Sequence, residues 1–413
     1  MKVLQLSRAS RFGGAGIAAY RLHKGLQQIG VDCSVLANHV VQPEPNVVGP
    51  GSTKEKIMAK VVPVLDKLPG KFSATPGERV SSSWFPDGLL PRVARLHPDI
   101  INIHWVSYGF MKIETLPKFK QPLVWTLHDM WAFAGGEHYV GDSLRYQEGY
   151  TANNRPSGES GLDINRWIWK RKKKSWTNLD NLVIATPSRW LGECVQKSDL
   201  FRSTRVEVLP NGIDHERFRP MDCKTVREIL GLPVDKKLVL FGAGSATSDP
   251  RKGFNYLVEA LRYLEAKHDV SDYELVVFGS TSGDDTFKMK THYLGSLNDE
   301  ISMALVYAAA DVFVAPSTED NLPNTILEAL SCGTPCVAFD IGGMPDMIMH
   351  EQNGYLAKSF DTVDLAQGLK WVTEDSARWQ RLSKAGRSKV VNEYALAVSA
   401  QRYLNLYEEL LRK

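Results

Sequence analysis

The stretch Ala315–Pro335, with the sequence APSTEDNLPNTILEALSCGTP, decides the fold of the second half of the chain. It starts at the end of an apolar strand, continues as a polar loop, and enters a helix near Pro323, since proline favours a first helical turn. Glu328 lies inside this helix in an otherwise apolar run, where a buried carboxylate needs polar partners such as ribose hydroxyls. The alternative for Glu328 is a surface glutamate.

A rhythm of short apolar strands and amphipathic helices runs through all 413 residues. We expect strands at 3–6, 33–37, 100–104, 123–127 and 182–186, and then at 238–241, 275–278, 292–294, 312–315 and 336–339. The turn chemistry of 208–214 separates the two groups. The pattern predicts two doubly wound Rossmann-like α/β domains, 1–205 and 206–394, with ligands bound outside the carboxyl ends of strands that face each other across a cleft.

Composition excludes several classes of protein. The chain is 43% hydrophobic and 23% charged, which rules out wholesale disorder, a coiled coil and a collagen-like fibre. Its formal net charge of +3 is too small for an obligate nucleic-acid binder. Residues 1–200 carry 26 basic and 17 acidic side chains, whereas residues 201–413 carry 24 and 30. The first half is therefore expected to favour an anionic partner or surface.

The sequence also predicts a location. No stretch approaches the roughly 20 apolar residues of a membrane-spanning helix, and the apolar run at 1–6 is too short for a signal peptide. The five cysteines are scattered, and no second Cys/His cluster joins Cys332 and Cys336 in a metal site. We expect a cytoplasmic protein whose cysteines stay reduced.

A glycine-rich loop that contains Gly13 and Gly14 follows the first strand, and we expect a helix over 17–29 after it. Glycines let main-chain amides approach an anion at the positive end of a helix. Gly14-x-Gly16-x-x-Ala19 also fits a dinucleotide fingerprint, but that fingerprint needs an acidic residue after the second strand, and 36–39 contains none. A phosphate or sugar cradle, an NAD site and a simple packing turn remain open as interpretations.

Two further strand ends carry polar residues. The strand at 123–127 delivers His128 and Asp129, and an imidazole there can bind a substrate hydroxyl or stabilise developing charge. The alternative is a structural histidine, and the position at a strand end favours the functional interpretation. Arg251 and Lys252 precede a helix at 254–264, and two cations beside a helix N-terminus suit a diphosphate. The alternative for these two cations is an exposed basic turn.

Together these motifs resemble the retaining glycosyltransferases of family 4, which have the two-domain GT-B fold. The resemblance covers nearly the whole chain, in a shared order of motifs: the Gly-Gly loop, Thr-Leu-His-Asp at 126–129, Asn-Gly-Ile-Asp at 211–214, Arg-Lys-Gly at 251–253 and Ala-Leu-x-Cys-Gly-Thr-Pro at 329–335. The stretches 126–131 and 319–324 resemble the branch of bacterial exopolysaccharide enzymes of the colanic-acid and amylovoran type. The helix at 395–413 resembles the family's last helix, which returns to the N-terminal domain.

The resemblance implies a nucleotide-sugar site. Gly13 and Gly14 would approach the donor diphosphate, His128 would contact the donor sugar, Lys252 would hold the phosphates and Glu328 would bind the ribose. The catalytic group would comprise His128, Asp320, Lys252 and Arg251, and the remaining donor-binding candidates are Glu319, Asn321, Leu322, Pro323, Asn324, Gly242 and Leu294.

Three departures from the family pattern stand out. Seven residues separate Asp320 from Glu328, so the first carboxylate of the family's Glu-x7-Glu motif is an aspartate here, or Glu319 shares its role. Gly242 is followed by Ala-Gly where the family has an arginine, which Arg251 would supply. Relatives place clustered cysteines after His-Asp-x-Trp, but 135–161 contains none and must be ordered otherwise or remain mobile.

The expected chemistry needs no metal and no cofactor, because cations and helix N-termini can stabilise the departing diphosphate and the sequence has no convincing Asp-x-Asp metal loop. The family precedent is transfer from a UDP- or GDP-linked sugar with retention of configuration. Two rivals remain: a sugar-nucleotide epimerase or hydrolase of the same fold, which turns over the donor without acceptor, and a non-catalytic sugar-nucleotide-binding subunit, which binds without turnover.

The acceptor side is assigned to the basic first half. Segments 54–71 and 166–176 combine lysines and arginines with apolar residues, and each well-placed cation contributes about 1 kcal/mol at an anionic lipid surface. The alternative for 166–176 is a solvated helix face with packed tryptophans. The resemblance implies a saccharide or polyprenyl-diphosphate-linked acceptor, and a position at the inner face of the plasma membrane.

Overall fold

The structure, a computed structural model, describes residues 1–72, 80–244, 246–283 and 287–412. It divides into two compact units. The first comprises Met1–Asn211 and Ser399–Lys413, and the second comprises Gly212–Val398. The domain bounds predicted from the sequence placed the corresponding breaks after residues 205 and 394. The chain enters and leaves the second unit side by side, because Ile213 forms a parallel bridge with Ala395.

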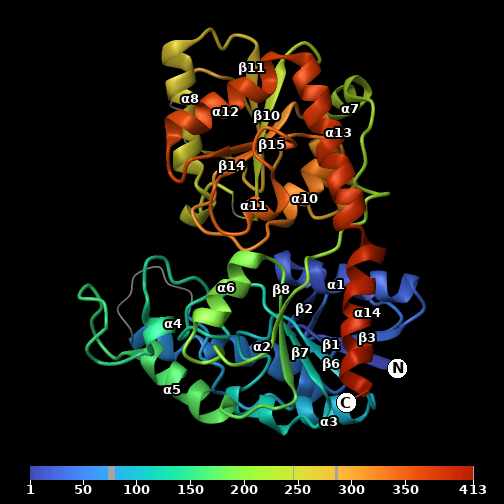
Figure 1. The fold of residues 1–413 in the computed structure, drawn as a ribbon, viewed down its shortest axis with the longest axis vertical. Coiled ribbons are helices and arrows are strands. Elements are labelled where there is room, and N and C mark those ends of the chain that lie inside the picture. Colours follow the sequence, from blue (N-terminus) through green and yellow to red (C-terminus); the bar gives the residue numbers. More distant parts are fainter. Residues whose placement is uncertain (73–79, 245, 284–286, 413) are drawn as a thin grey trace. The chain divides into compact units, whose positions relative to one another are not determined.

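The first unit is built on a parallel sheet with the strand order β5-β3-β1-β6-β7-β8-β9 (Figure 1). Its strands are β1 (Lys2–Leu6), β3 (Asp32–Leu36), β5 (Val47–Val48), β6 (Ile100–Ile103), β7 (Leu123–Thr126), β8 (Leu182–Thr186) and β9 (Val206–Val208). All five strands expected here form, and β5 and β9 are additional. Both are short and lie at the edges of the sheet, where a strand needs fewer apolar residues.

Both faces of this sheet are covered, since successive side chains of a strand point to opposite faces. Val3 and Val124 pack with one apolar cluster, while Leu4 and Trp125 pack with another. The first cluster includes side chains of α1 (Gly13–Gln28) and α14 (Leu396–Arg412), and the second includes side chains of α3 (Leu89–Ala94), α5 (Ile164–Trp176) and α6 (Arg189–Lys197).

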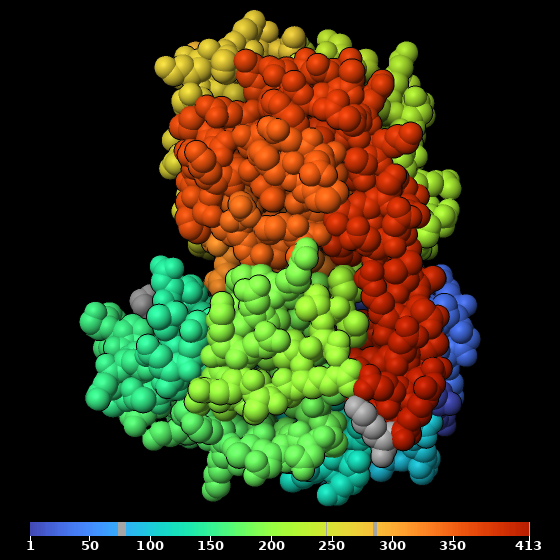
Figure 2. All heavy atoms as spheres, in the orientation of Figure 1, coloured from blue at the N-terminus to red at the C-terminus, as the bar shows by residue number. Residues whose placement is uncertain are grey.

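The part of α14 from residue 399 onward belongs to the first unit, where it lies at the surface near the N-terminal residues (Figure 2). Its Tyr407 hydroxyl accepts a hydrogen bond from Asn102 Nδ2 at 2.7 Å, and the Tyr403 hydroxyl lies 3.0 Å from Thr126 Oγ1. These buried bonds tie the C-terminal helix to β6 and β7.

Smaller elements complete the first unit. They are β2 (Ala9–Ser10), β4 (His39–Val40), α2 (Thr53–Asp66), α4 (Arg145–Glu148) and the 3₁₀ turns η1 (Pro69–Phe72) and η2 (Ile113–Lys118). Among the described residues, no helix is both long enough and apolar enough to cross a membrane.

The second unit has a parallel sheet in the order β12-β11-β10-β13-β14-β15. Its strands are β10 (Lys237–Gly242), β11 (Tyr273–Phe278), β12 (Thr291–Tyr293), β13 (Val312–Ala315), β14 (Cys336–Phe339) and β15 (Gly354–Ala357). The five expected strands form, and β15 is additional. Order 11-10-13-14 reverses direction beside β10, and such a switch point is where ligands bind in open α/β sheets.

Helices cover both faces of the second sheet as well (Figure 1). They are α7 (Cys223–Leu230), η3 (Pro250–Lys252), α8 (Phe254–Lys267), α9 (Glu300–Ala309), α10 (Asn324–Ser331), α11 (Met344–Met347), α12 (Thr362–Glu374) and α13 (Ser376–Glu393). The apolar clusters alternate along β10, where Leu240 faces α9 and α10 and Val239 faces α8 and α12. Because β10 and β13 are parallel neighbours, the loops that follow them emerge at the same edge of the sheet.

Candidate functional site

The loops after β10 and β13 bring a cation and a carboxylate together in the second unit. Lys252 Nζ lies 2.6 Å from Asp320 Oδ2, and Arg251 Nη1 lies 3.5 Å from the same oxygen. Arg251 also donates to the main-chain oxygen of Glu319 at 2.8 Å. Asp320 is thus a carboxylate in contact with both cations.

Close main-chain packing holds this pair in place. Gly253, at φ +72°, approaches the loop after β13 so closely that a Cβ would lie 1.8 Å from the carbonyl oxygen of Pro316. On the other side, Gly343 N donates to the Asp320 carbonyl at 3.1 Å, and a Cβ on Gly342 would lie 2.2 Å from that oxygen. Glycines after two different strands therefore set the position of Asp320.

Electrostatics at this pair favour the ionised carboxylate. Burial alone would raise the pKa of Asp320, but the charges of Lys252 and Arg251 and an amide of Asn321 hold that pKa below its usual value. The negative charge of Asp320 neutralises part of the positive charge of the two cations. A diphosphate bound to Lys252 would have to compete with Asp320 or recruit the second cation.

Glu328 lies in the second turn of α10, and its side chain is buried. The hydroxyl of Tyr307, from α9, donates to Glu328 Oε2 at 3.0 Å. Burial raises the pKa of Tyr307 well above its usual value, and the Glu328 charge adds to the effect. The alternative of a surface glutamate is therefore wrong, and the predicted need for polar partners is met in part by a tyrosine.

The remaining donor-binding candidates lie around the same edge. Asn321, Leu322 and Pro323 are buried in the loop, Pro323 is the N-cap residue of α10, and Asn324 is its first residue. Gly242 ends β10, where a Cβ would lie 2.3 Å from the Phe278 ring, so glycine is required there for packing. Leu294 follows β12, and its amide bonds to Val277 O. Ser245, in the loop after β10, lies outside the described residues.

In the first unit, two histidines meet at the carboxyl ends of β6 and β7. His104 Nδ1 lies 3.1 Å from His128 Nε2, and the two ring planes are 21° apart. Burial lowers the pKa of His128 to about 4 and the pKa of His104 well below its usual value. Both imidazoles are therefore neutral near pH 7, so His128 can act as a hydrogen-bonding group rather than as a cation.

Asp129 supports the next part of this edge. Its Oδ2 accepts hydrogen bonds from Trp105 Nε1 at 2.8 Å and from His138 Nδ1 at 2.7 Å. Burial would raise the pKa of Asp129, but His138 and the other donors lower it overall. A cavity of about 10 Å³, the size of one water molecule, is lined by His104, Trp105, His128 and Asp129 among others.

Gly13 and Gly14 form the start of α1, after β1 and β2. Both are exposed, and Gly13 has a φ of +69°, which a residue with a side chain rarely adopts. The expected helix began at residue 17, so its start is four residues earlier than predicted. The main-chain amides of both glycines belong to the first turn, where helix amides lack intrahelical acceptors.

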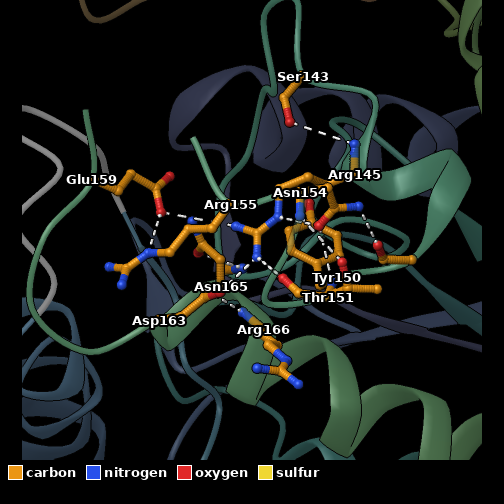
Figure 3. Close-up of polar contacts among 12 residues, drawn as sticks. Ser143, Arg145, Tyr150, Thr151, Asn154, Arg155, Glu159, Asp163, Asn165 and Arg166 are labelled. Atoms are coloured by element: carbon orange, nitrogen blue, oxygen red, sulfur yellow. Dashed lines mark hydrogen bonds and ion pairs between the residues drawn. The ribbon is translucent and has the colours of Figure 1, made fainter. Parts of the chain in front are cut away.

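The cysteine-free segment after His128 is ordered by ion pairs (Figure 3). Arg145 is buried, and its guanidinium binds Asp163 Oδ2 at 2.6 Å. The guanidinium carbon lies 4.5 Å from the centroid of the Tyr150 ring. Arg155 pairs with Glu159 at 3.3 Å. Ion pairs thus order this segment, at the place where relatives are expected to have clustered cysteines.

Lys172 anchors the other end of this segment from α5. It is fully buried, and its ammonium group donates to the main-chain oxygens of Trp131, Ala134 and Gly135. The ammonium also lies 3.9 Å from the centroid of the Trp131 ring. Burial lowers the pKa of Lys172 well below its usual value, while Glu137 and Asp129 oppose the shift.

These contacts bear on the two interpretations of 166–176, a membrane-facing segment or a helix with packed tryptophans. Trp169 and Trp176 are buried in the core, Lys172 is buried, and Arg171 binds Glu114 at 2.9 Å. The packed-tryptophan alternative is the one that the structure supports. The helix directs Trp169 and Trp176 inward because β7 and α6 offer them an apolar surface, whereas Trp167 is 40% exposed.

Segment 54–71 differs, because its apolar residues are exposed. Ile57 (55% exposed), Val61 and Val64 (64%) share one face of α2. With the exposed Leu68 and Phe72 (65%), which follow α2, they form an exposed apolar stripe along the chain. Lys56, Lys60 and Lys67 lie beside this stripe. No ion pair to these three lysines exists within the part of the chain that is described.

Within the described ranges, no three His, Cys, Asp or Glu side chains gather as a metal site requires. The five cysteines form no disulfide bond with one another. Metal-independent chemistry remains a prediction.

The sequence did not identify five residues that contact the candidate site residues or the loop beside them: His104, Trp105, His138, Lys172 and Tyr307. A signal was available for His104, because it ends the strand next to the one that delivers His128. Nothing in the sequence links Lys172 to the loop at 131–135, since that contact joins residues about forty positions apart.

Comparisons with known proteins match both units. Residues 12–217 match the family model described as Glycosyltransferase Family 4, and residues 236–375 match the model described as Glycosyl transferases group 1. A D-inositol 3-phosphate glycosyltransferase of Xylanimonas cellulosilytica is 27% identical, over 97% of this chain and 93% of that protein. A UDP-Gal:alpha-D-GlcNAc-diphosphoundecaprenol alpha-1,3-galactosyltransferase of Escherichia coli is 29% identical, over 50% of this chain and 55% of that protein.

Solved structures share the fold. Sucrose-phosphate synthase from Thermosynechococcus elongatus aligns with a TM-score of 0.70 and 18% identity, covering 100% of this chain and 99% of that one. Anabaena HepE, solved in complex with UDP-glucose, aligns with a TM-score of 0.61 and 16% identity, covering 99% and 100%. The expected pair of Rossmann-like units is therefore confirmed as the GT-B fold.

Proposed function

We propose that this chain, a glycosyltransferase of the GT-B type, transfers a hexose with retention of configuration from a UDP- or GDP-linked donor to a saccharide or polyprenyl-diphosphate-linked acceptor. We place it in bacterial exopolysaccharide synthesis, in the branch that resembles colanic-acid and amylovoran enzymes. The reaction would proceed without a metal or cofactor at the inner face of the plasma membrane. The relatives named above support an acceptor that carries phosphate, since inositol 3-phosphate and diphosphoundecaprenol both do.

The observation that carries the proposal is the contact of Asp320 with Lys252 and Arg251, at the carboxyl edge of the second sheet. Two cations at one strand end can hold a diphosphate, and a carboxylate between them can accept hydrogen bonds from sugar hydroxyls. Glu328 is assigned to the ribose, with Tyr307 fixing one of its oxygens. The loop 321–324 and the strand ends at Gly242 and Leu294 are assigned to the rest of the donor.

The proposed reaction breaks the bond between the anomeric carbon and the diphosphate oxygen. The nucleoside diphosphate leaves with the electron pair, and Lys252 and Arg251 stabilise its negative charge, which is usually the largest catalytic effect. The acceptor hydroxyl oxygen bonds to the anomeric carbon on the face that the diphosphate leaves, and its proton passes to a leaving phosphate oxygen. His128, neutral at pH 7, is assigned to the donor sugar, and the Gly13 and Gly14 amides are assigned to the diphosphate.

Segment 54–71 is assigned to the membrane. Its exposed apolar stripe would enter the headgroup region, and Lys56, Lys60 and Lys67 would meet anionic lipids at the stripe's edge. This assignment fits an acceptor delivered by a lipid carrier. The segment 166–176 is not assigned to the membrane, because Trp169 and Trp176 are buried in the core and only Trp167 is exposed.

A thermal-shift panel of UDP-, GDP-, ADP- and dTDP-sugars together with NAD(H) tests the donor class. A ligand at 100 times its Kd stabilises a protein by about 2.7 kcal/mol. We expect one nucleotide family to respond, and Lys252→Ala and Glu328→Ala to abolish the response. Lys267→Ala is the matched control, because this exposed lysine ends the helix that follows Lys252. A response to NAD(H) alone, or one that neither variant changes, contradicts the proposal.

Turnover with the responding sugar separates the rivals. A glycosyltransferase releases nucleoside diphosphate rapidly only when acceptor is present. Equal turnover without acceptor would favour the epimerase or hydrolase. Binding with no turnover on undecaprenyl-diphosphate-linked saccharides or free saccharides would favour a binding subunit.

A further inference from the structure

Arg8 has an unusual position in the first unit. It follows β1 (Lys2–Leu6) at the edge where the strands end, and its amide donates to Trp105 O at 2.9 Å. Its guanidinium carbon lies 5.7 Å from the Trp105 ring centroid and 5.4 Å from the Tyr108 ring centroid. Across the described ranges, no hydrogen bond or ion pair reaches its guanidinium nitrogens, although burial lowers its pKa.

Lys67, the C-cap residue of α2, shares the same aromatic ring. Its Nζ lies 5.3 Å from the Tyr108 centroid, and it too has no ion pair with any described residue. Two cations on one ring repel each other unless an anion lies between them. This arrangement costs free energy in the unliganded protein, and the rings compensate only in part.

Asp66, an acid whose charge acts on Arg8, forms no ion pair with either cation in the part of the chain that the structure describes. Its carboxylate accepts hydrogen bonds from the Ser81 hydroxyl at 2.9 Å and from Ser82 N at 3.2 Å. Burial raises the pKa of Asp66, although the serine donors lower it in part. The charge of Asp66 attracts Arg8 from a distance, but its oxygens are already occupied by Ser81 and Ser82.

We propose that Arg8 and Lys67 form a subsite that binds a phosphate or diphosphate group of the acceptor substrate. The inference rests on the proposed function, because it assigns a role to the acceptor side of the same enzyme. A phosphate carries a charge of about −1.5 to −2 and three acceptor oxygens, which matches two cations, whereas a carboxylate matches one. Arginine supplies a planar fork of donors to such a group, and lysine supplies a mobile point charge.

The subsite lies next to the predicted reacting residues. Trp105, which stacks on Arg8, donates through Nε1 to Asp129 Oδ2 at 2.8 Å, and Asp129 directly follows His128. Lys67 in turn ends the helix that carries the exposed apolar stripe. A phosphate bound by Arg8 and Lys67 would therefore lie between the stripe and the His128 strand end. This placement suits an acceptor phosphate and not the donor diphosphate, which is assigned to Lys252.

Calorimetric titration with inorganic pyrophosphate tests the subsite. We expect Arg8→Gln to weaken one class of pyrophosphate binding at least about tenfold, because each charge-assisted hydrogen bond to a phosphate contributes strongly. Lys252→Ala should leave that class intact and remove the other class, at the donor site. Arg202→Gln is the matched control, since Arg202 is an exposed arginine of the same unit that is already paired with Asp199.

Two results would overturn the inference. One is an Arg8→Gln variant that binds pyrophosphate as Arg202→Gln does. The other applies if Arg8→Gln does not fold. In that case Lys67→Gln, a change at an exposed residue, is tested instead, and unaltered pyrophosphate binding in this variant contradicts the inference. Failure of the proposed function is a separate result, because it would show as a loss of nucleotide-sugar binding or turnover in the unmodified protein while Arg8-dependent binding persists.

Vesicle sedimentation identifies the source of the phosphate. Vesicles of phosphatidylcholine with undecaprenyl diphosphate are compared with vesicles of phosphatidylcholine with phosphatidylglycerol. If the acceptor is lipid-linked, Arg8→Gln should reduce binding to the first kind only. If the acceptor is a soluble phosphorylated sugar or polyol, Arg8→Gln should weaken pyrophosphate binding and leave both kinds of vesicle unaffected. Either result supports the subsite, provided that the pyrophosphate affinity falls.

Discussion

The Nδ1 atom of His104 lies 3.1 Å from the Nε2 atom of His128, between two rings that are both neutral near pH 7. In such a contact one of these two nitrogens carries a proton and donates it, and the other accepts. His104 Nε2 is buried and has no hydrogen-bond partner among the described residues. An unpaired buried N–H is rarer than an unpaired acceptor, so we infer that His104 donates from Nδ1 and His128 keeps its own proton on Nδ1. His104 is thus a positioning residue that selects the tautomer of His128.

Exchanging the donor at residue 104 should change the acid–base behaviour of His128. In His104→Asp, a carboxylate replaces the donor and raises the pKa of His128, so the acidic limb of the pH profile of kcat/KM should move toward neutrality. His104→Asn keeps an amide N–H near the Nδ1 position and should retain the original profile. Nitrogen NMR of His128 would report the tautomer directly. Identical profiles in both variants would contradict a positioning role.

Removing the ammonium group of Lys172 should destabilise the first unit. Lys172→Met leaves the main-chain oxygens of Trp131, Ala134 and Gly135 buried without their donor, at a cost of about 3 kcal/mol. Lys174→Met is the matched control, because this lysine lies on the same helix and is exposed. Urea unfolding compares the two variants. Equal stabilities would show that the buried ammonium contributes no net stability.

Adding a methyl group at Gly253 should disrupt the donor site. Gly253→Ala combines a strained φ of +72° with a clash against the Pro316 carbonyl, whereas Gly231→Ala has a similar φ of +66° and open space. We expect Gly231→Ala to cost about 1 kcal/mol and to leave ligand binding unchanged. Gly253→Ala should cost more and weaken nucleotide-sugar binding, because Lys252 shifts relative to Asp320. Thermal midpoints with and without ligand separate the two effects.

Acid should destabilise the first unit through its buried histidines. Burial lowers the pKa of His23 to about 4, below an unfolded value near 6.5, so the unfolded chain binds more protons between these values. The stability from neutral His23 is complete above pH 6.5 and is lost as the pH falls toward 4. At pH 5 the loss is about 2 kcal/mol for this residue. His23→Leu should flatten the fall in stability between pH 7.5 and 5, as urea unfolding would show.

Much of the fold follows from local pattern. The apolar runs of β1, β7, β8, β13 and β14 identify strands because each is bounded by turn chemistry and followed by an amphipathic helix. Short edge strands such as β5 and β15 escaped prediction, since two to four residues with partial burial carry little periodic signal. The start of α1 was also misplaced, because two glycines in a first helical turn look like a loop.

The sequence indicated only those residues of the candidate site that follow a predicted strand, in the next loop or helix. Lys252, Asp320 and Glu328 could be proposed from motif and position, and the structure adds that Asp320 contacts the cations. Partners such as Tyr307 and His104 come from other elements, so no spacing indicates them. The basic run at 170–174 gives no sign that Lys172 is buried, because composition does not say which face of a helix is buried.

By itself, the sequence determined the two parallel α/β units and the polar residues at their strand ends, because hydrophobic periodicity and turn residues act over a few positions. Only the tertiary structure decided which side chains meet. It brought Lys172 to Gly135, His104 to His128, and Arg8 and Lys67 to Tyr108. Those contacts depend on how strands and helices pack across the sheet, and packing joins residues far apart in the chain.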